Sequence, residues 1–210
     1  MKTKAHTVYR NSQGKKVPGV TTVLGILNKP ALVPWANRLG LEGIDVKKFV
    51  DDKADIGTLG HAICTDLLLG VPTDYSHYDQ HQIDKAENCA LSFFSWLDKH
   101  TLIPIIVEGQ FANEEWGGTC DIYGILDGKY TLVDLKTGSG IWEEYLYQCS
   151  AYAHLLINNG FPVEEVRVLN IPRAETEKFK EEIYTKDELQ TGWEIFEHCH
   201  RIYSLKKKIK

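Results

Sequence analysis

The stretch TLVDLKTGSG, residues 131–140, decides how the chain folds. Apolar residues lead into Asp134, Lys136 follows two positions later, and the run then breaks into Thr-Gly-Ser-Gly. Residues two apart in a β-strand point to the same face of the sheet. The pattern therefore predicts a largely apolar strand that ends with a carboxylate and an ammonium side by side.

The segment before this strand predicts its hairpin partner. GGTCDIYGIL (117–126) and KYTLVDLKT (129–137) are β-rich runs separated by Asp127-Gly128. Asp-Gly between two such runs is a strong signal for a tight hairpin. The register set by this turn places Asp121 opposite a residue near Asp134. We therefore expect two carboxylates to face one another across neighbouring strands.

Two facing carboxylates repel each other unless a cation lies between them. Lys136 supplies one positive charge, but a divalent cation satisfies both carboxylates better. Oxygen ligands at this density select Mg²⁺ or Mn²⁺ over metals that prefer sulfur. Taken alone, Asp134 and Lys136 would more often form a structural ion pair, so the residues themselves leave both interpretations open.

The rest of the chain predicts helices around a mixed sheet. Helices are expected at 56–70, beginning at Gly57-Thr58, and at 79–100, followed by strands at 103–112, 117–126 and 129–137. A helix at 142–160 and a fourth strand at 163–172 come next. Short helices are expected at 17–27, capped by Thr21, and at 31–43, and a capping box from Thr185 to Glu188 opens a long terminal helix. This order predicts an α/β or α+β fold with a helical N-terminal extension.

The composition is that of an ordinary globular chain. Its 210 residues are 43% hydrophobic and 25% charged, which favours one domain. No apolar run approaches the ~18 residues that span a membrane, and the first ten residues lack the apolar stretch of a signal peptide. Five widely spaced cysteines predict reduced thiols in the cytoplasm, with neither a zinc site nor an iron–sulfur cluster. We therefore expect an intracellular protein without membrane contact.

The charge is segregated along the chain. Residues 1–50 carry nine basic and two acidic residues, residues 51–200 carry ten and twenty-seven, and residues 201–210 carry five and none. The net charges are therefore +7, −17 and +5. Basic ends on an acidic middle can flank the track of a polyanion, and the alternative is a solvated arm and tail.

Several motifs in this order resemble one family. GTLGH (57–61), GGTCD (117–121), VDLKTG (133–138) and QCSAY (148–152) together resemble the PD-(D/E)xK nuclease superfamily, and within it the RecB-like and phage-type exonucleases. The stretch at 17–36 is also similar to the segment before the core in phage exonucleases and in a mitochondrial single-strand exonuclease. The resemblance covers roughly residues 17–172.

The resemblance implies a fold and an activity. The fold would be a restriction-endonuclease-like αβββαβ core at 56–172, after a helical extension at 1–55 and before a C-terminal helix and basic tail at 173–210, all in one nuclease domain. The activity would be that of a Mg²⁺- or Mn²⁺-dependent DNA exonuclease, which hydrolyses phosphodiester bonds through a metal-activated water. Its substrate would be linear DNA ends, single strands included, in a bacterial or phage-encoded cytoplasmic setting.

The resemblance also implies the residues of the metal site. Asp121 and Asp134 would bind the metal together with the backbone carbonyl of Leu135. His61 would complete the site or bind a second ion. Lys136 would position or help deprotonate the attacking water and stabilise the charge that develops on the phosphate.

Further residues would support the site or contact DNA. Glu108 would be an outer-shell ligand at most. Gln148 and Tyr152 would contact the DNA backbone or hold the loop after the Asp-x-Lys strand. Three residues of the N-terminal segment would wall the track of a DNA strand: Lys29, Trp35 and Arg38.

One position departs from the family pattern. Relatives of this type often carry a glutamate four residues after the histidine, whereas this chain has Thr65 there and Asp66 next. The departure leaves the number of metal ions open. Two other functions also stay open: a nucleolytically inactive DNA-end-binding protein of the same fold, and a metal-dependent endonuclease.

Overall fold

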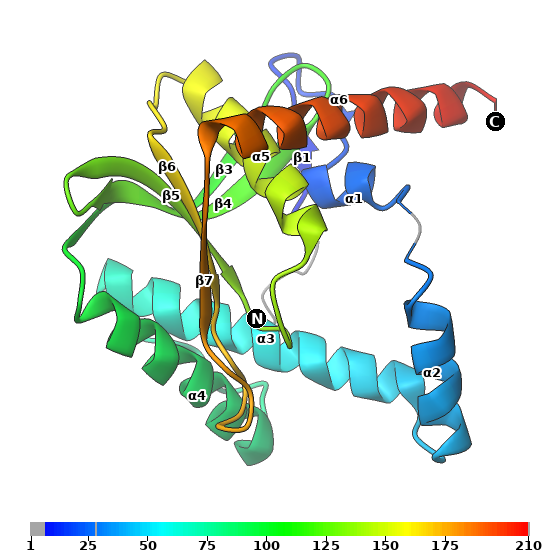
Figure 1. Ribbon diagram of the computed structural model, residues 1–210, viewed down its shortest axis with the longest axis vertical. Coiled ribbons are helices and arrows are strands. Elements are labelled where there is room, and N and C mark those ends of the chain that lie inside the picture. Colours follow the sequence, from blue (N-terminus) through cyan, green and yellow to red (C-terminus); the bar gives the residue numbers. More distant parts are fainter. Residues whose placement is uncertain (1–6, 28, 210) are drawn as a thin grey trace.

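A five-stranded mixed sheet forms the centre of the computed structural model, which describes residues 7–27 and 29–209 (Figure 1). The sheet order is β3–β4–β5–β6–β7, in which β5 and β6 are parallel and the other neighbours antiparallel. The bounds are β3 (Leu102–Ala112), β4 (Gly117–Leu126), β5 (Lys129–Lys136), β6 (Glu165–Asn170) and β7 (Lys180–Tyr184). The predicted α/β fold with a mixed central sheet is confirmed.

Helices cover both faces of this sheet. α3 (Val46–Leu69) and α4 (Gln80–Leu97) lie on one face, and α5 (Glu143–Asn158) and α6 (Lys186–Lys208) on the other (Figure 1). Two shorter helices, α1 (Val20–Leu24) and α2 (Leu32–Leu41), precede them, after a two-stranded ribbon of β1 (Tyr9–Arg10) and β2 (Lys16–Val17). The long C-terminal helix begins at the predicted capping box of Thr185 and Glu188.

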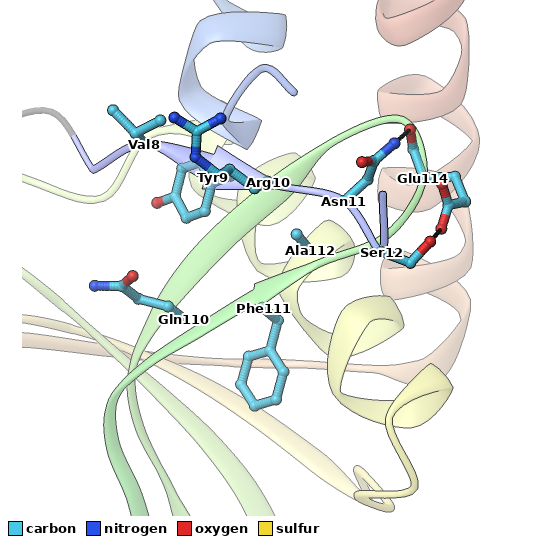
Figure 2. A pocket seen from close by; sticks show the side chains of 9 residues that line it. All are labelled: Val8, Tyr9, Arg10, Asn11, Ser12, Gln110, Phe111, Ala112 and Glu114. Atoms are coloured by element: carbon cyan, nitrogen blue, oxygen red, sulfur yellow. Dashed lines mark hydrogen bonds between the residues drawn. The ribbon is translucent and has the colours of Figure 1, made fainter. Parts of the chain in front are cut away.

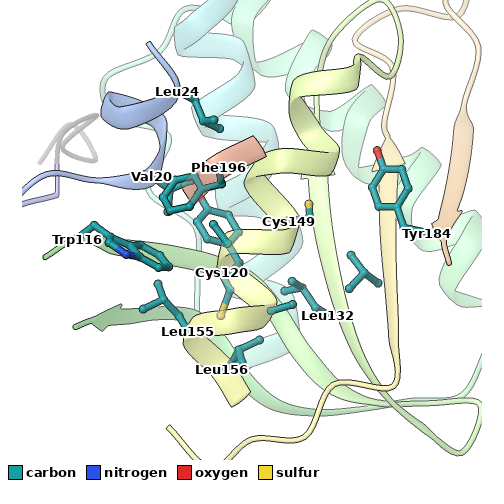
Figure 3. Packing of buried hydrophobic residues seen from close by; sticks show 14 of the residues in the cluster. Val20, Leu24, Trp116, Cys120, Leu132, Cys149, Leu155, Leu156, Tyr184 and Phe196 are labelled. Carbon is teal, nitrogen blue, oxygen red and sulfur yellow. The ribbon is translucent and has the colours of Figure 1, made fainter. Parts of the chain in front are cut away.

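The apolar core is divided into two clusters by the sheet. One cluster joins the sheet to α1, α5 and α6 and includes Leu132, Leu155 and Phe196 (Figure 3). The other joins it to α3 and α4 and includes Val133 and Leu135. Because side chains alternate along a strand, the positions of Asp134 and Lys136 fall on the face of Leu132, toward α5.

The predicted start of the third helix at Gly57-Thr58 is wrong. The helix begins at Val46, where the side chain of Asp45 accepts hydrogen bonds from the first turn. Gly57 lies inside the helix, and a Cβ there would come 2.6 Å from Oγ1 of Thr137. The glycine therefore allows the loop after β5 to approach α3, and it does not mark a helix boundary.

The first helix also differs from the prediction. Its N-cap is Gly19 rather than Thr21, and no side chain caps it. A backbone hydrogen bond from Gly117 to the carbonyl of Pro18 (2.9 Å) ties the preceding segment to β4. Tertiary contacts of this kind place a helix that is too short to be stable alone.

Three strands escaped the sequence analysis. β1 and β2 have two residues each. β7 has the sequence KEEIY, and only its last residue is buried. An exposed edge strand of this composition lacks the apolar alternation that identifies a strand.

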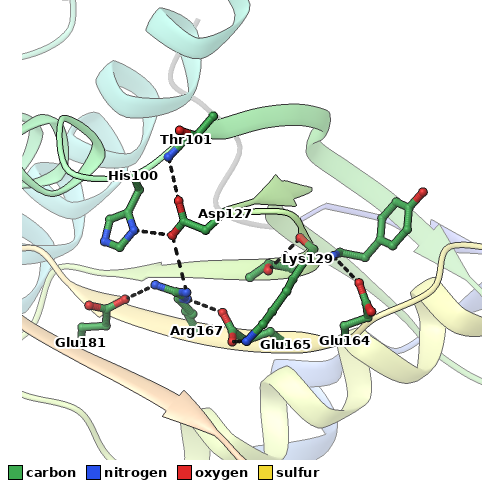
Figure 4. Close-up of polar contacts among 10 residues, drawn as sticks. His100, Thr101, Asp127, Lys129, Glu164, Glu165, Arg167 and Glu181 are labelled. Atoms are coloured by element: carbon green, nitrogen blue, oxygen red, sulfur yellow. Dashed lines mark hydrogen bonds and ion pairs between the residues drawn. The ribbon is translucent and has the colours of Figure 1, made fainter.

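A paired group of charged side chains lies at the turn end of β5; we call it the turn-end cluster (Asp127, Lys129, Glu165, Arg167 and Glu181). Arg167 donates to Glu165 (2.6 Å) and Glu181 (2.9 Å), and Lys129 donates to Glu165 (2.7 Å) (Figure 4). Asp127 accepts from the backbone of Thr101 (2.9 Å) and lies 3.9 Å from Arg167. Its positive and negative members are in contact, so the cluster is close to electrically balanced.

The predicted basic segments at the two ends of the chain are described only in part. Residues 1–6 of the basic N-terminal block and Lys210 of the basic tail lie outside the described residues. All five cysteines are free thiols, and all are buried. Within 7–27 and 29–209, no helix combines the length and apolarity needed to cross a membrane.

Candidate metal centre

Three carboxylates lie in one row across β3, β4 and β5. The hairpin register around Asp127-Gly128 is the predicted one, and Asp121 and Asp134 follow directly after its last pair, Ile122 with Val133. On the other side of β4, Glu108 lies opposite Asp121, between the pairs Val107–Ile122 and Gly109–Cys120. We call Glu108, Asp121 and Asp134, together with His61 and Lys136, the cleft-end cluster.

His61 reaches this row from α3. Its Nδ1 lies 3.6 Å from Oδ2 of Asp121, an oxygen that also accepts the backbone N–H of Leu135 at 2.7 Å. Ligand atoms of His61, Glu108 and Asp121 all lie within 4.8 Å of one another, a spacing that allows them to share a cation. The sequence analysis gave Glu108 an outer role only, whereas the structure groups it with the two others.

Asp134 and Lys136 form the opposite side of the cluster. The ammonium Nζ lies 2.5 Å from Oδ2 of Asp134, and this oxygen accepts no hydrogen bond of regular geometry in the described structure. The Asp134 side chain is 2% exposed and that of Lys136 15%. Asp134 is not one of the three residues whose ligand atoms meet within 4.8 Å, and its Oδ2 faces the lysine.

The electrostatics of the cluster favour a bound cation. Burial raises the pKa of Asp121 and of Asp134, although Lys136 opposes the shift in both. Partial desolvation, followed by the charges of Asp121, Asp66 and Asp134, raises the pKa of Glu108 to about 7, even though this residue is exposed at the mouth of the cleft. One ammonium therefore compensates three carboxylates, and a divalent cation would restore the balance.

His61 is suited to bind such a cation. Burial, followed by the charge of Lys136, lowers its pKa to about 4. The imidazole is therefore neutral near pH 7 and offers a nitrogen lone pair, as a metal ligand must. Carboxylate oxygens are the majority of this donor set, and they are the ligands that suit Mg²⁺ or Mn²⁺, so the residues present fit the implied metal.

The backbone at Glu108 is unusual for a strand. Its φ is +52°, one of two positive values at non-glycine residues in the described part of the chain. Such a conformation costs on the order of 1–3 kcal/mol and collects at functional sites. Here it interrupts the ladder beside Asp121, where the carboxylate of Glu108 joins the group.

Three members of the cleft-end cluster, His61, Glu108 and Asp121, line a cleft of about 970 Å³, whereas Asp134 and Lys136 are not among the described residues that line it. Its walls come from the segment before α1, from α3 and from β3 and β4, and they include Lys53 and Asp66. A hollow of about 400 Å³ beside β1 and β3 shares Val8, Tyr9 and Gln110 with this cleft (Figure 2). The two together provide a continuous surface along the edge of the sheet.

Gln148 and Tyr152, which were predicted to support the site, form a hydrogen-bonded pair. Gln148 donates a hydrogen bond to the hydroxyl of Tyr152 (2.7 Å), and Tyr152 lines the cleft. The ring of Tyr152 packs so closely on β4 that a Cβ at Gly118 would come 2.5 Å from it. The pair thus fixes one wall of the cleft.

The three predicted residues of the N-terminal track are not among the described residues that line the cleft. Lys29 forms an ion pair with Glu144 at the start of α5. Trp35 lies with its ring centre 6.2 Å from that of Phe49, and Arg38 is exposed on α2. A role for them in binding DNA remains a prediction.

Thr65 stands where the family pattern has a glutamate, and the neighbouring Asp66 lines the cleft in its place. Thr65 is 3% exposed, and its hydroxyl donates to the carbonyl of His61 (3.0 Å) one turn earlier. Asp66, the next residue, lines the cleft, and its charge raises the pKa of Glu108. An acidic side chain is therefore present on this wall, one position later than in the pattern.

Sequence reasoning missed three residues near the site. Lys53 lies one turn before Gly57 on α3, in a stretch that was not predicted to be helical. Thr137 packs on Gly57, and the glycine itself was the signal for that contact. Tyr145 lies with its ring centre 4.9 Å from Nζ of Lys136. No sequence signal distinguished this tyrosine from its aromatic neighbours in the helix.

Comparisons with known proteins add little to these observations. No family model matches the sequence, and no curated protein matches it significantly. Among solved structures, a phage-related exonuclease from Haemophilus somnus 129PT is similar over 72% of this chain and 82% of its own. The sequence identity is 12% and the TM-score 0.40. A similarity at this level carries no argument about the function of this chain.

Proposed function

We propose that this chain is a divalent-metal-dependent DNA exonuclease that hydrolyses phosphodiester bonds. One observation carries the proposal: a row of three carboxylates has a neutral imidazole on one side and an ammonium on the other, and two of its members, Glu108 and Asp121, line a cleft of about 970 Å³ together with His61. A structural ion cluster has no need of uncompensated negative charge, whereas a site for a divalent cation and a phosphate does.

The ligands of the cation would come from four elements. His61, Glu108 and Asp121 already lie within reach of one ion, and Asp134 with the carbonyl of Leu135 would complete the set. A bound Mg²⁺ or Mn²⁺ ion polarises the scissile phosphate and lowers the pKa of a water molecule beside it.

Lys136 would act as a cation and not as a base. Burial opposes its charge, but Asp134 and Asp121 outweigh burial and raise its pKa. The ammonium therefore keeps its protons near pH 7. It would donate a hydrogen bond to the attacking water and stabilise the charge that develops on the phosphate oxygens.

The substrate would enter along the cleft beside Lys53 and Tyr152. DNA as the substrate, and attack from an end, are drawn from the resemblance of the motifs between residues 57 and 152 to phage-type exonucleases. The five buried thiols suit the reducing cytoplasm of a bacterial or phage-infected cell.

Digestion of end-labelled DNA tests this function. Linear DNA labelled at the 5′ or the 3′ end, single- and double-stranded, is incubated with the protein in Mg²⁺, in Mn²⁺ or in EDTA. We expect metal-dependent loss of label from one end, and no loss with the isosteric variant Asp134→Asn. Covalently closed circles, which an exonuclease cannot attack, should survive.

The same assay separates the other functions. Cleavage of closed circles would identify an endonuclease of the same fold. DNA binding without cleavage in any metal would identify an end-binding protein, and would contradict the hydrolytic role of the cleft-end cluster.

A further inference from the structure

Lys136 brings a flexible side chain into a site with three carboxylates. Its ammonium lies 2.5 Å from the carboxylate of Asp134 and also interacts electrostatically with Asp121. A lysine side chain has about 2 kcal/mol of rotamer entropy. A single contact therefore does not fix the position of its ammonium relative to the three carboxylates. A second, uncharged contact would restrict it without occupying a metal ligand.

The ring of Tyr145 provides such a contact. Nζ of Lys136 lies 4.9 Å from the ring centre. Ring faces attract ammonium ions at this distance, and the attraction grows when water is excluded. A carboxylate in this place would add a fourth negative charge to the cluster, whereas the ring adds none.

Tyr145 is itself held in place from two sides. It lies in the first turn of α5, where its backbone N–H donates to the carbonyl of Trp142 (2.9 Å). Its ring packs against the apolar cluster that contains Leu132. Its hydroxyl lies beside the loop after β5, 3.8 Å from where a Cβ of Gly138 would be. That loop is fixed in turn, because the Gly138 N–H donates to the buried side chain of Asn170 (3.2 Å).

The geometry points to Tyr145 as a positioning residue, whose ring face holds the ammonium of Lys136 beside Asp134 for phosphodiester hydrolysis. This inference rests on the proposed function and adds a residue outside the ligand set. The phenol contributes no charge near pH 7, because burial raises the pKa of Tyr145 further above its ordinary value of 10.

Two substitutions separate the ring from simple packing. Tyr145→Phe keeps the ring and removes the hydroxyl, whereas Tyr145→Leu keeps an apolar side chain and removes the ring. The matched control is Tyr203→Leu, because Tyr203 holds Lys207 in the same kind of contact (4.6 Å) at the far end of α6.

Kinetics give the first readout. We expect Tyr145→Leu to lower kcat about tenfold, with KM changed less than about twofold, as for an interaction that matters in the transition state. Tyr145→Phe and Tyr203→Leu should stay within about twofold of the wild type. An unchanged kcat in Tyr145→Leu would overturn the inference, and so would an equal loss in Tyr145→Phe.

NMR gives a readout that is independent of activity. In metal-free protein with labelled lysine, the ring current of Tyr145 should move the ε-CH₂ resonance of Lys136 upfield. This resonance is assigned by its absence from the spectrum of the Lys136→Met variant. The shift should persist in Tyr145→Phe and vanish in Tyr145→Leu. A resonance unmoved by Tyr145→Leu would show that the ring does not hold the ammonium. If the wild type is inactive but still shows the shift, the proposed function and the catalytic role of Tyr145 are wrong. The contact between Tyr145 and Lys136 would then still be established.

Discussion

The charged side chains at the two ends of strand β5 differ in how far their charges are compensated by partners within the chain. In the turn-end cluster, Lys129 and Arg167 are hydrogen-bonded to acidic partners that nearly cancel their charge (Figure 4). In the cleft-end cluster, Lys136 is the counter-charge to three carboxylates. A compensated cluster can serve the fold alone, whereas the excess negative charge of the cleft-end cluster would be relieved by a bound cation or by protonation.

The backbone shows the same contrast. The described residues include two non-glycine residues with positive φ, one in each cluster: Asp127 at +51° and Glu108 at +52°. Asp127 precedes Gly128 in a tight hairpin turn, which requires that conformation. Glu108 lies inside a strand, where no turn requires it, and the conformation is instead associated with the position of its carboxylate near Asp121. The backbone conformation at Glu108 therefore agrees with the proposed role of its carboxylate in the cleft-end cluster.

Two lysines of the same strand should differ most in their effect on DNA cleavage. Lys136→Ala should reduce DNA cleavage by about a thousandfold or more, because it removes a charge aimed at the reacting phosphate. Lys129→Ala, at the other end of β5, should leave the rate close to that of the wild type. Initial rates on end-labelled DNA measure both, with circular dichroism to verify folding. Equal rates in the two variants would remove the distinction between the clusters.

The opposite experiment acts on the turn-end cluster. Arg167 is 8% exposed and bridges Glu165 and Glu181. Arg167→Met should lower the free energy of unfolding by about 3 kcal/mol, because it removes two charge-assisted hydrogen bonds, to Glu165 and Glu181, and leaves Glu165 with Lys129 alone. Urea denaturation measures the loss. Cleavage at a temperature where the variant is folded should persist, and a variant that is stable but inactive would contradict this assignment.

Added metal should stabilise the protein through the cleft-end cluster and not through the turn-end cluster. At a hundredfold excess over its dissociation constant, Mn²⁺ should stabilise the wild type by about 2.7 kcal/mol. Asp121→Asn should lose most of this gain, and Arg167→Met should keep it. Thermal denaturation in Mn²⁺ and in EDTA provides the measurement. A gain retained in Asp121→Asn would place the cation elsewhere.

The smallest expected effect is on pH dependence, where the two clusters act with opposite sign. Lys129 and Arg167 outweigh burial and lower the pKa of Glu165. The stability from Glu165 is therefore present above its ordinary pKa and is lost in acid, below about pH 4. The pKa of Glu108 is raised to about 7, so its ionisation destabilises the metal-free fold above neutrality, and this penalty disappears as the pH falls.

Denaturation of metal-free protein at several pH values tests these signs. Between pH 8 and pH 6, the wild type should become more stable, whereas Glu108→Gln should show little change. A wild type whose stability falls steadily from pH 8 to pH 4 would indicate that Glu108 has no raised pKa in the folded state.

Much of the fold could be predicted because local signals determine it. Asp127-Gly128 sets the hairpin register, and with it the approach of Asp121 to Asp134. The capping box of Thr185 and Glu188 marks the start of α6. Each of these signals acts between residues close in the sequence, so no tertiary contact is needed to interpret it.

The remaining features depend on contacts between distant segments. Gly57 was taken for a helix start, but it is required by Thr137, eighty residues later. The grouping of Glu108 with Asp121 depends on the β3–β4 register, which the longer loop between these strands does not fix. The contact of Tyr145 with Lys136 depends on how α5 docks on the sheet. Such relations follow from packing and are not encoded in local patterns.

Diffraction from crystals soaked in Mn²⁺ would show whether the cleft-end cluster binds a divalent cation. An anomalous difference map should show a peak among His61, Glu108 and Asp121, absent in crystals of Asp121→Asn. A map without a peak at this position in the wild type, at Mn²⁺ concentrations that support cleavage, would contradict the account.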